Sequence, residues 1–402
     1  MTTAAPLTGA ALHFPALRLH NRVLPLLITA GAVVVLGTGF LSLAPNRLLS
    51  GSPVALWAAA DAKLLALIGL CGALLLAVSF LPPHRTVYRA AALIAAIVVL
   101  TILAAAGQGA TSLAASVPAR ARVSLGAGFW ILFGAAGLML VDALQRAETG
   151  IAARLAVMAG FTLAFVVMAQ AGLFEALSLA REYHTRADFF AGALVRHILL
   201  VAAAVGPALA IGFPLGVLAA RRPRVQGSLF AVLNLLQTVP SVALFGLLIV
   251  PLSALATALP PLAAIGVGGI GPAPAIIALI LYALLPVVRN SMAGIAGVDP
   301  GVLEAGRGMG MTPRQLFWHA ELPLAAPVLL AGFRIVIVQS IGLAVVAALI
   351  GAGGLGSLVF EGLGQYAADL VLLGALPAIA LALAADFLLQ ILSALLDRRF
   401  GR

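Results

Sequence analysis

The segment DPGVLEAGRGMGMTPRQLFWHAELP, residues 299–323, is the longest polar insertion between the late apolar runs of this chain. It contains two helix starts: Asp299 precedes a proline, and Thr312 stands three residues before a glutamine, the spacing of a capping box. Three glycines that disfavour a continuous helix lie between the two starts: Gly306, Gly308 and Gly310. We therefore predict a short helix, a glycine bend and a second short helix, which ends at Pro323 where the next apolar run begins.

Apolar side chains are crowded into the second half of this 299–323 loop, next to charged ones. The apolar residues are Met309, Met311, Leu316, Phe317 and Trp318, and the charged residues beside them are Glu304, Arg307 and Arg314. Exposed apolar anchors surrounded by charge are typical of a protein contact surface. The alternative interpretation is an interfacial helix that lies among lipid headgroups.

The chain as a whole is too apolar for a water-soluble fold. Of its 402 residues 63% are hydrophobic and 9% are charged, whereas soluble domains carry roughly a quarter charged residues. Apolar runs long enough to cross about 30 Å of hydrocarbon recur along the sequence, and the first is longer than a signal-peptide core, so we expect it to be retained. We predict an all-α integral membrane protein of about ten transmembrane helices, at 23–44, 64–83, 90–106, 123–141, 155–174, 198–220, 228–250, 272–290, 323–350 and 370–396.

Two proline- or glycine-rich segments interrupt the later runs. The uncharged stretch from Val225 to Val288 is too long for one helix, and its middle, Pro251 to Pro274, is expected to be a constrained connection between two helices. The segment GAGGLG at 351–356 separates the last two predicted helices. No sheet is predicted beside it, so a flexible gate or re-entrant turn is favoured over a dinucleotide-binding loop.

The basic residues indicate membrane topology. The chain has 23 basic and 13 acidic residues, and the basic ones lie singly or in short clusters between apolar runs, which does not favour nucleic-acid binding. If the N-terminus is cytoplasmic, the loops on that side hold about twice as many basic residues as the loops outside. We therefore predict a multi-pass protein with both termini in the cytoplasm.

The sequence indicates no enzyme chemistry. Cys71 is the only cysteine, so an intrachain disulfide and a cysteine-based metal site are excluded, and the histidines are scattered without metalloprotease spacing. Lys63 is the only lysine and it follows Ala62, so the chain lacks the Gly-Lys pair of a P-loop. We expect no bound cofactor or metal and no ATP site of the P-loop kind.

Two ionisable residues lie inside the predicted spans. Arg334 is eleven residues after Pro323 and Asp386 is eleven residues before Asp397, so both are about 16 Å from the cytoplasmic ends of their helices. We predict that they pair. Two interpretations remain: a packing pin between neighbouring helices, or a role for Asp386 as a transient partner of a cationic solute. The other candidate pathway or helix-pairing residues are Gln237, Pro240 and Tyr282, although core packing is the simpler interpretation for Tyr282.

The 299–323 loop resembles the EAA loop in the permease subunits of ABC importers. The likeness rests on Glu304 and Ala305, on Gly310 four residues after Gly306, and on the sequence Glu-Leu-Pro at 321–323. Gly306 stands where the family usually has alanine, and Ala320 where it usually has isoleucine. The resemblance implies coupling helices that fit into a groove of a cytoplasmic ATPase. Their residues here would be Glu304, Ala305, Gly306, Gly310, Met311, Leu316, Phe317, Leu322 and Pro323.

The resemblance extends over residues 190–396 and implies a five-helix importer core that contains the 299–323 loop. The motifs QTVPS at 237–241, YALLP at 282–286 and GAGGLG at 351–356 are similar to those of the subgroup that imports glycine betaine, choline and related osmoprotectants. Residues 1–180, with about five predicted helices, resemble the N-terminal extension of the longer members of this subgroup.

This resemblance implies a permease subunit in a bacterial inner membrane, in contact with lipid. The implied partners are an ATPase subunit, a second permease subunit that is identical or related, and a periplasmic or lipid-anchored substrate-binding protein. Two alternatives remain open. One is an ABC importer for another small solute such as an amino acid, and the other is an ion-gradient-driven secondary transporter that uses Arg334 and Asp386 as its coupling pair.

Overall fold

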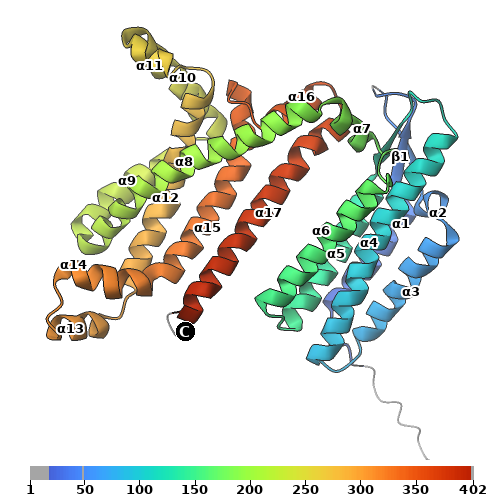
Figure 1. Ribbon diagram of the computed structural model, residues 1–402, viewed down its shortest axis with the longest axis horizontal. Helices are drawn as coiled ribbons and strands as arrows, with labels where there is room; N and C mark the ends of the chain where they lie inside the picture. The colour runs from blue at the N-terminus through green and yellow to red at the C-terminus, as the bar shows by residue number, and fades with distance from the viewer. Residues whose placement is uncertain (1–17, 48, 400–402) are drawn as a thin grey trace, which may run out of the picture. The chain divides into compact units, whose positions relative to one another are not determined.

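The computed structural model of the chain describes residues 18–47 and 49–399. The chain divides into two compact units, Met1–Ala180 and Arg181–Arg402 (Figure 1). Within the described ranges, eight helices are long and apolar enough to cross a membrane, and Val23–Gly37 (α1) and Ala62–Val78 (α3) are shorter apolar helices. The prediction of an all-α membrane protein is confirmed in its essentials. Residues 1–17 and Arg402, which the topology prediction places in the cytoplasm, lie outside the described residues.

The first unit is organised around one long helix, α4 (Arg85–Ala115), which packs against α2, α3, α5 and α6. The other elements of this unit are β1 (Leu41–Ala44), β2 (Ser52–Val54), α2 (Leu56–Ala59), β3 (Arg122–Leu125), α5 (Ala127–Arg146) and α6 (Ile151–Gln170), and α7 (Ser178–Thr185) crosses the unit boundary. The buried face of α4 contains many alanines. Small side chains let helices approach closely, and this close packing holds helices together in lipid.

A three-stranded antiparallel sheet in the order β2-β1-β3 is a feature that the sequence prediction missed. The predicted helix 23–44 is wrong in its second half, because α1 ends at Gly37 and the chain turns into β1. At this turn a Cβ on Gly39 would lie only 2.6 Å from the Pro53 Cβ, so the turn needs glycine. The predicted helix 123–141 is likewise wrong at its start, where β3 lies. Apolar strands of three or four residues cannot be told from the end of an apolar helix by periodicity.

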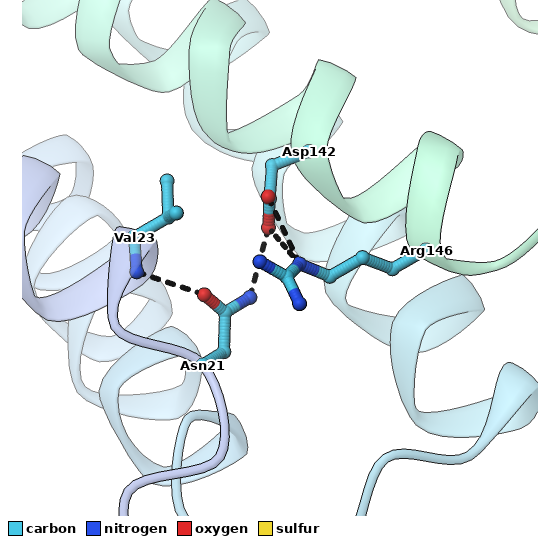
Figure 2. Close-up of polar contacts among 4 residues, drawn as sticks. All are labelled: Asn21, Val23, Asp142 and Arg146. Carbon is cyan, nitrogen blue, oxygen red and sulfur yellow. Dashed lines mark hydrogen bonds and ion pairs between the residues drawn. The ribbon is translucent and has the colours of Figure 1, made fainter.

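A polar cluster joins the start of α1 to the end of α5 (Figure 2). The Asn21 side-chain amide donates to Asp142 Oδ2 at 2.8 Å, and Asn21 Oδ1 accepts from the Val23 N–H at 2.9 Å. Arg146 Nε donates to both oxygens of Asp142 at 2.9 Å. Asn21 is buried, and these bonds engage both ends of its amide, as a buried polar group requires. The cluster therefore fixes the point at which α1 begins against α5.

The second unit is organised around α12 (Pro272–Ala296), which packs against α8, α9, α10 and α15 (Figure 1). The other elements before the 299–323 loop are α8 (Ala187–Arg221), α9 (Pro223–Thr238), α10 (Ser241–Ala258) and α11 (Pro260–Ala264). The later elements are α13 (Pro300–Gly308), α14 (Pro313–Leu316), the π-helical turn η1 (Phe317–Glu321), α15 (Leu322–Val346), the 3₁₀ turn η2 (Ala347–Ile350), α16 (Gly356–Gly364) and α17 (Ala368–Arg399).

Two glycines set the distance between α8 and α12. A Cβ on Gly212 would lie 2.6 Å from Val287 Cγ1. A Cβ on Gly216 would lie 2.4 Å from the Ser291 Cβ and 2.8 Å from the backbone oxygen of Val288. Two small residues four positions apart place one smooth stripe on a helix, against which a second helix packs closely. The central contact of the second unit therefore depends on the absence of side chains at these two positions.

The predicted helix at 228–250 is wrong, because two helices, α9 and α10, replace it. The break falls at Val239, whose φ of −71° and ψ of 126° are extended. The proline ring of Pro240 disfavours the helical region for the residue before it, which explains the break. α10 then continues through Pro251 to Ala258, so the connection to α12 is shorter than the predicted 251–274. It consists of α11 and a turn in which Gly266 and Gly271 have positive φ.

The 351–356 segment is a turn between η2 and α16. Three of its glycines, Gly351, Gly353 and Gly354, have φ between 76° and 81°, a region that side chains disfavour. The turn is held from α8 by Arg196, whose Nε donates to the Ala352 carbonyl at 3.1 Å. The short helix α16 that follows was not predicted, since nine residues rich in glycine carry little helical signal.

Candidate functional site

The 299–323 loop folds into two helical segments with the predicted starts. Asp299 Oδ1 accepts from the Gly301 N–H at 2.7 Å at the beginning of α13. Thr312 and Gln315 form a capping box at the beginning of α14, in which the Thr312 N–H donates to Gln315 Oε1 at 2.9 Å. Both predicted helix starts are confirmed. Each cap satisfies backbone groups that the helix leaves free, so the loop has a defined backbone.

The bend between the two segments depends on Gly310 alone. Gly310 has φ 82°, the Met311 N–H donates to the Gly306 carbonyl at 3.1 Å, and the Gly310 N–H donates to the Arg307 carbonyl at 2.9 Å. This pair of bonds is a Schellman motif, which requires a left-handed residue after the helix. Gly306 and Gly308 lie inside α13, so the prediction that they break the helix is wrong. An isolated glycine weakens a helix by only about 1 kcal/mol, and the surrounding contacts outweigh this cost.

The second segment does not end at Pro323. A continuous helical run of 38 residues, Pro313–Ile350, joins α14 to α15, so this part of the prediction is wrong. A proline inside a helix removes one hydrogen bond and crowds the carbonyl one turn earlier. The π-helical turn η1 lies at that place, with the Leu322 N–H bonded to the Phe317 carbonyl, and its wider winding accommodates the ring.

Gly306 is the contact point between the two segments. It is buried, and a Cβ there would lie 2.5 Å from Leu316 Cδ1 and 3.5 Å from Met311 Sδ. Leu316 is itself 7% exposed, so it is part of the loop's interior. Glycine in place of the alanine that is usual in the resembling family therefore lets α13 lie closer to α14.

Gly306→Ala is expected to change the unfolding free energy by no more than about 1 kcal/mol, because the gain in helix propensity offsets the displacement of a flexible leucine end. Gly306→Val is expected to destabilise by about 2 kcal/mol or more, since a branched side chain has no space. Thermal unfolding of the detergent-solubilised subunit measures both. The double variant Gly306→Val/Leu316→Ala should recover stability, and equal effects of alanine and valine would contradict the proposed contact.

One basic residue that the sequence analysis treated only as a topology signal anchors the loop. Arg221, at the end of α8, donates from an Nη atom to Glu321 Oε2 at 2.9 Å. Its guanidinium also lies over the Phe317 ring, 5.2 Å from the ring centre. Glu321 is mostly buried, with 12% of its side chain exposed. The sequence signal was a carboxylate beside apolar positions at a membrane boundary, which requires a cation, but the partner lies a hundred residues earlier.

Arg221→Ala is expected to destabilise the subunit by about 1 to 3 kcal/mol and to lower uptake, because it leaves the Glu321 carboxylate without its cation and removes the contact with Phe317. Thermal unfolding and transport assays measure the two effects. Arg224→Ala, at a nearby exposed arginine, is the matched control. The exchange Arg221→Glu/Glu321→Arg should restore part of the loss, and an additive loss in this double variant would contradict the ion pair.

The apolar residues of the loop divide into an interior set and an exposed set. Leu316 is buried, while Phe317 and Leu322 pack against the core formed by Ile295, Val298, Ala325 and Leu329, so the expectation that all five apolar residues are exposed is wrong for part of the set. Three large hydrophobic side chains on α13, the turn and η1 are exposed: Val302 at 41%, Met309 at 73% and Trp318 at 56%. Glu304 and Ala305 are exposed as well. The available contact surface therefore consists of α13, the Gly310 turn and Trp318.

Gln237, Pro240 and Tyr282 lie together at the break between α9 and α10. Gln237 Nε2 donates to the Tyr282 carbonyl at 2.9 Å, and the Tyr282 hydroxyl donates to the Val239 carbonyl. Tyr282 is buried in a cluster with Phe245 and Leu200. The tyrosine therefore bonds a carbonyl that the break removes from helix hydrogen bonding, a structural arrangement that fits the packing interpretation.

Arg334 on α15 and Asp386 on α17 form the predicted ion pair. Gln390, one turn further along α17, donates to the second carboxylate oxygen of Asp386 at 2.7 Å. The pairing is confirmed, and Gln390 is an addition that the sequence analysis did not include. Its signal was available, since residues four apart lie on one face of a helix.

Comparison with known proteins places both units. Residues 212–402 match the family described as "Binding-protein-dependent transport system inner membrane component", and residues 20–180 match "ABC transporter permease YehY, N-terminal domain". The chain is 42% identical to the "Carnitine transport permease protein OpuCB" of Listeria monocytogenes over 48% of this chain and 82% of the relative. It is 41% identical to the "Osmoprotectant import permease protein OsmW" of Salmonella typhimurium over 52% of this chain and 93% of the relative.

A third relative, the "Glycine betaine/carnitine/choline transport system permease protein OpuCB" of Bacillus subtilis, is 37% identical over 48% of this chain and 82% of its own length. These likenesses show that the chain belongs to the family of binding-protein-dependent ABC importer permeases, in a long form with an added N-terminal domain. The resemblance inferred from the 299–323 loop is thereby confirmed.

Proposed function

We propose that this chain carries glycine betaine, carnitine, choline or closely related osmoprotectants through the inner membrane, driven by ATP hydrolysis in a partner subunit. The substrates in the names of three relatives, which share 37 to 42% identity with the chain, support this substrate class. Membership of a binding-protein-dependent family also disfavours the ion-gradient alternative. Import of another solute remains as an outcome of the test below.

The observation that carries the mechanism is the exposed surface of the 299–323 loop. Met309 and Trp318 present large apolar side chains on a backbone that two caps and the Arg221–Glu321 pair hold in place. Rigid apolar anchors surrounded by polar groups are what a protein groove binds best. We place the ATPase subunit on this surface, on the cytoplasmic side, with Glu304 and Ala305 at the contact and both chain termini on the same side.

The remaining partners are proposed from the family to which the chain belongs. A second permease subunit, identical or related, would complete the translocation path, and a periplasmic or lipid-anchored binding protein would deliver the solute. The chain holds no Gly-Lys pair for a P-loop, which supports ATP hydrolysis by the ATPase subunit. We propose that the chain itself acts as the translocation subunit, without enzyme activity or a bound cofactor. Movement of the ATPase subunits would shift the equilibrium between outward-open and inward-open states through the loop.

The test is uptake into proteoliposomes that contain the chain with an ATPase subunit and a substrate-binding protein that copurify with it. We expect radiolabelled betaine, carnitine or choline to accumulate with ATP, and not with a non-hydrolysable analogue or with an ion gradient alone. Accumulation of proline or another amino acid in place of these solutes would overturn the substrate class. Accumulation without an ATPase subunit would overturn the mechanism.

A further inference from the structure

The ion pair joins α15 and α17, two neighbouring helices that are long and apolar enough to cross a membrane (Figure 1), and it is only half enclosed. Its side chains are 42% exposed for Arg334 and 27% exposed for Asp386. Arg334 is about 16 Å along the helix from Pro323, roughly half of the hydrocarbon thickness. A charged group at this depth faces protein or a water-filled path, and it is a candidate for function by its position.

The hydrogen bonds of the cluster are unequally distributed. Both carboxylate oxygens of Asp386 are engaged, one by Arg334 Nε and the other by Gln390 Nε2. Arg334 uses only Nε, and its two terminal nitrogens have no acceptor among the described residues. The negative charge of Asp386 is already paired with Arg334, which disfavours the role suggested from the sequence as partner of a cationic solute. The free hydrogen-bonding groups of the cluster are the N–H donors of Arg334, which would bind a hydrogen-bond acceptor.

We propose that Arg334 binds the carboxylate group of the transported solute within the membrane, and that Asp386 and Gln390 position it. This inference rests on the proposed function and deepens it. If the ion pair only held the two helices together, it would be buried and all its N–H groups would be hydrogen-bonded, because an unbonded guanidinium edge in hydrocarbon is costly. The two terminal nitrogens of an arginine match the two oxygens of a carboxylate in a fork, and this geometry is specific for such groups.

The proposal divides the solute class by its chemistry. Betaine and carnitine carry a carboxylate besides the quaternary ammonium group, whereas choline carries a hydroxyl in its place. Loss of a charge-assisted bond costs about tenfold or more in affinity, and this loss falls only on solutes that make the bond. Arg334 should therefore determine how strongly carboxylate solutes are preferred over choline.

The test compares ATP-driven uptake of betaine, carnitine and choline by the reconstituted complex. The double variant Arg334→Gln/Asp386→Asn removes both charges together, so that neither remains unpaired and folding is retained. Arg334→Lys keeps one positive charge without the fork. Gln339→Ala, at an exposed polar residue of the same helix, is the matched control. Thermal unfolding and native mass spectrometry report on folding and on the permease pair.

The expected result is a rise of about tenfold or more in the KM for betaine and carnitine in the double variant, a smaller rise in Arg334→Lys, and a change below about twofold for choline. If the complex carries carboxylate solutes but not choline, the inference is supported by KM values that are highest in the double variant, lower in Arg334→Lys and lowest in the unmodified protein. The thermal unfolding of the variants and the KM of Gln339→Ala must then be unchanged.

Equal loss for choline and betaine, or no loss, overturns the inference and leaves the proposed function intact. Dissociation of the permease pair in the double variant also overturns it, since the acceptor would then belong to the partner subunit. A wild-type complex that carries none of the three solutes overturns the proposed function itself.

Discussion

Trp318→Glu is expected to reduce ATP-driven uptake by about 100-fold or more without unfolding the subunit. The Trp318 side chain is 56% exposed and lies on η1, which is continuous with α14 and α15, so the change adds no cavity to the core. If the ATPase groove binds this ring, truncation together with a buried negative charge costs several kcal/mol of contact energy. Uptake and co-purification of the ATPase measure the effect.

A matched control is available in the first unit, where Trp57 on α2 is exposed to the same extent, 56%. Trp57→Glu should leave ATPase co-purification unchanged. Met309→Glu, at the apolar residue beside the Gly310 turn, should reproduce the loss caused by Trp318→Glu. The proposed contact surface is refuted if both variants of the loop retain ATPase binding, and the interfacial-helix interpretation is then favoured, with vesicle binding as its measurement.

Gly216→Val is expected to prevent stable folding of the second unit, with a loss of about 3 kcal/mol or more. A Cβ at this position would lie 2.8 Å from the backbone oxygen of Val288 and 3.1 Å from the backbone nitrogen of Met292, and backbone atoms of α12 cannot move aside separately. The helices must separate, and the core between α8 and α12 is lost with them. The yield of monodisperse protein and the thermal unfolding midpoint measure the effect.

The control lies on the same helix. A Cβ on Gly192 would meet no other atom within 4 Å, so Gly192→Val adds the same side chain to α8 without a clash. It should leave both the yield and the midpoint close to those of the unmodified protein. Similar losses in the two variants would show that valine disfavours α8 in general, and the close contact with α12 would then not be the cause.

The sequence predicts a structural feature correctly where that feature depends on residues close together in the chain. The caps at Asp299 and Thr312 were predicted correctly because a cap bonds a backbone group two or three residues away. The Arg334–Asp386 pair was predicted because ionisable residues at one depth inside apolar spans have few other partners. The prediction of a membrane protein rests on amino-acid composition, which does not depend on the tertiary structure.

The missed features depend on distant parts of the chain. Arg221 and Glu321 are a hundred residues apart, and only the packing of α8 beside α15 brings them together. The sheet of the first unit joins residues near 42, 53 and 124, each in a strand too short to give a period. Gly306 was expected to break a helix, but its burial against Leu316 shows that it permits a close contact. Intrinsic propensity is a weak guide when tertiary contacts decide a position.

Helical hydrogen bonding that continues from Pro313 to Ile350 couples the 299–323 loop to α15. The helix α15 itself has 25 residues and a length of about 37 Å, and its far end leads through η2 to the left-handed turn at Gly351. A tilt of about 10° that pivots at the loop end moves this far end by roughly 6 Å, as trigonometry on that length requires. Because no unwound linker separates the loop from α15, a small rotation at Trp318 becomes a larger displacement at the other end of the helix.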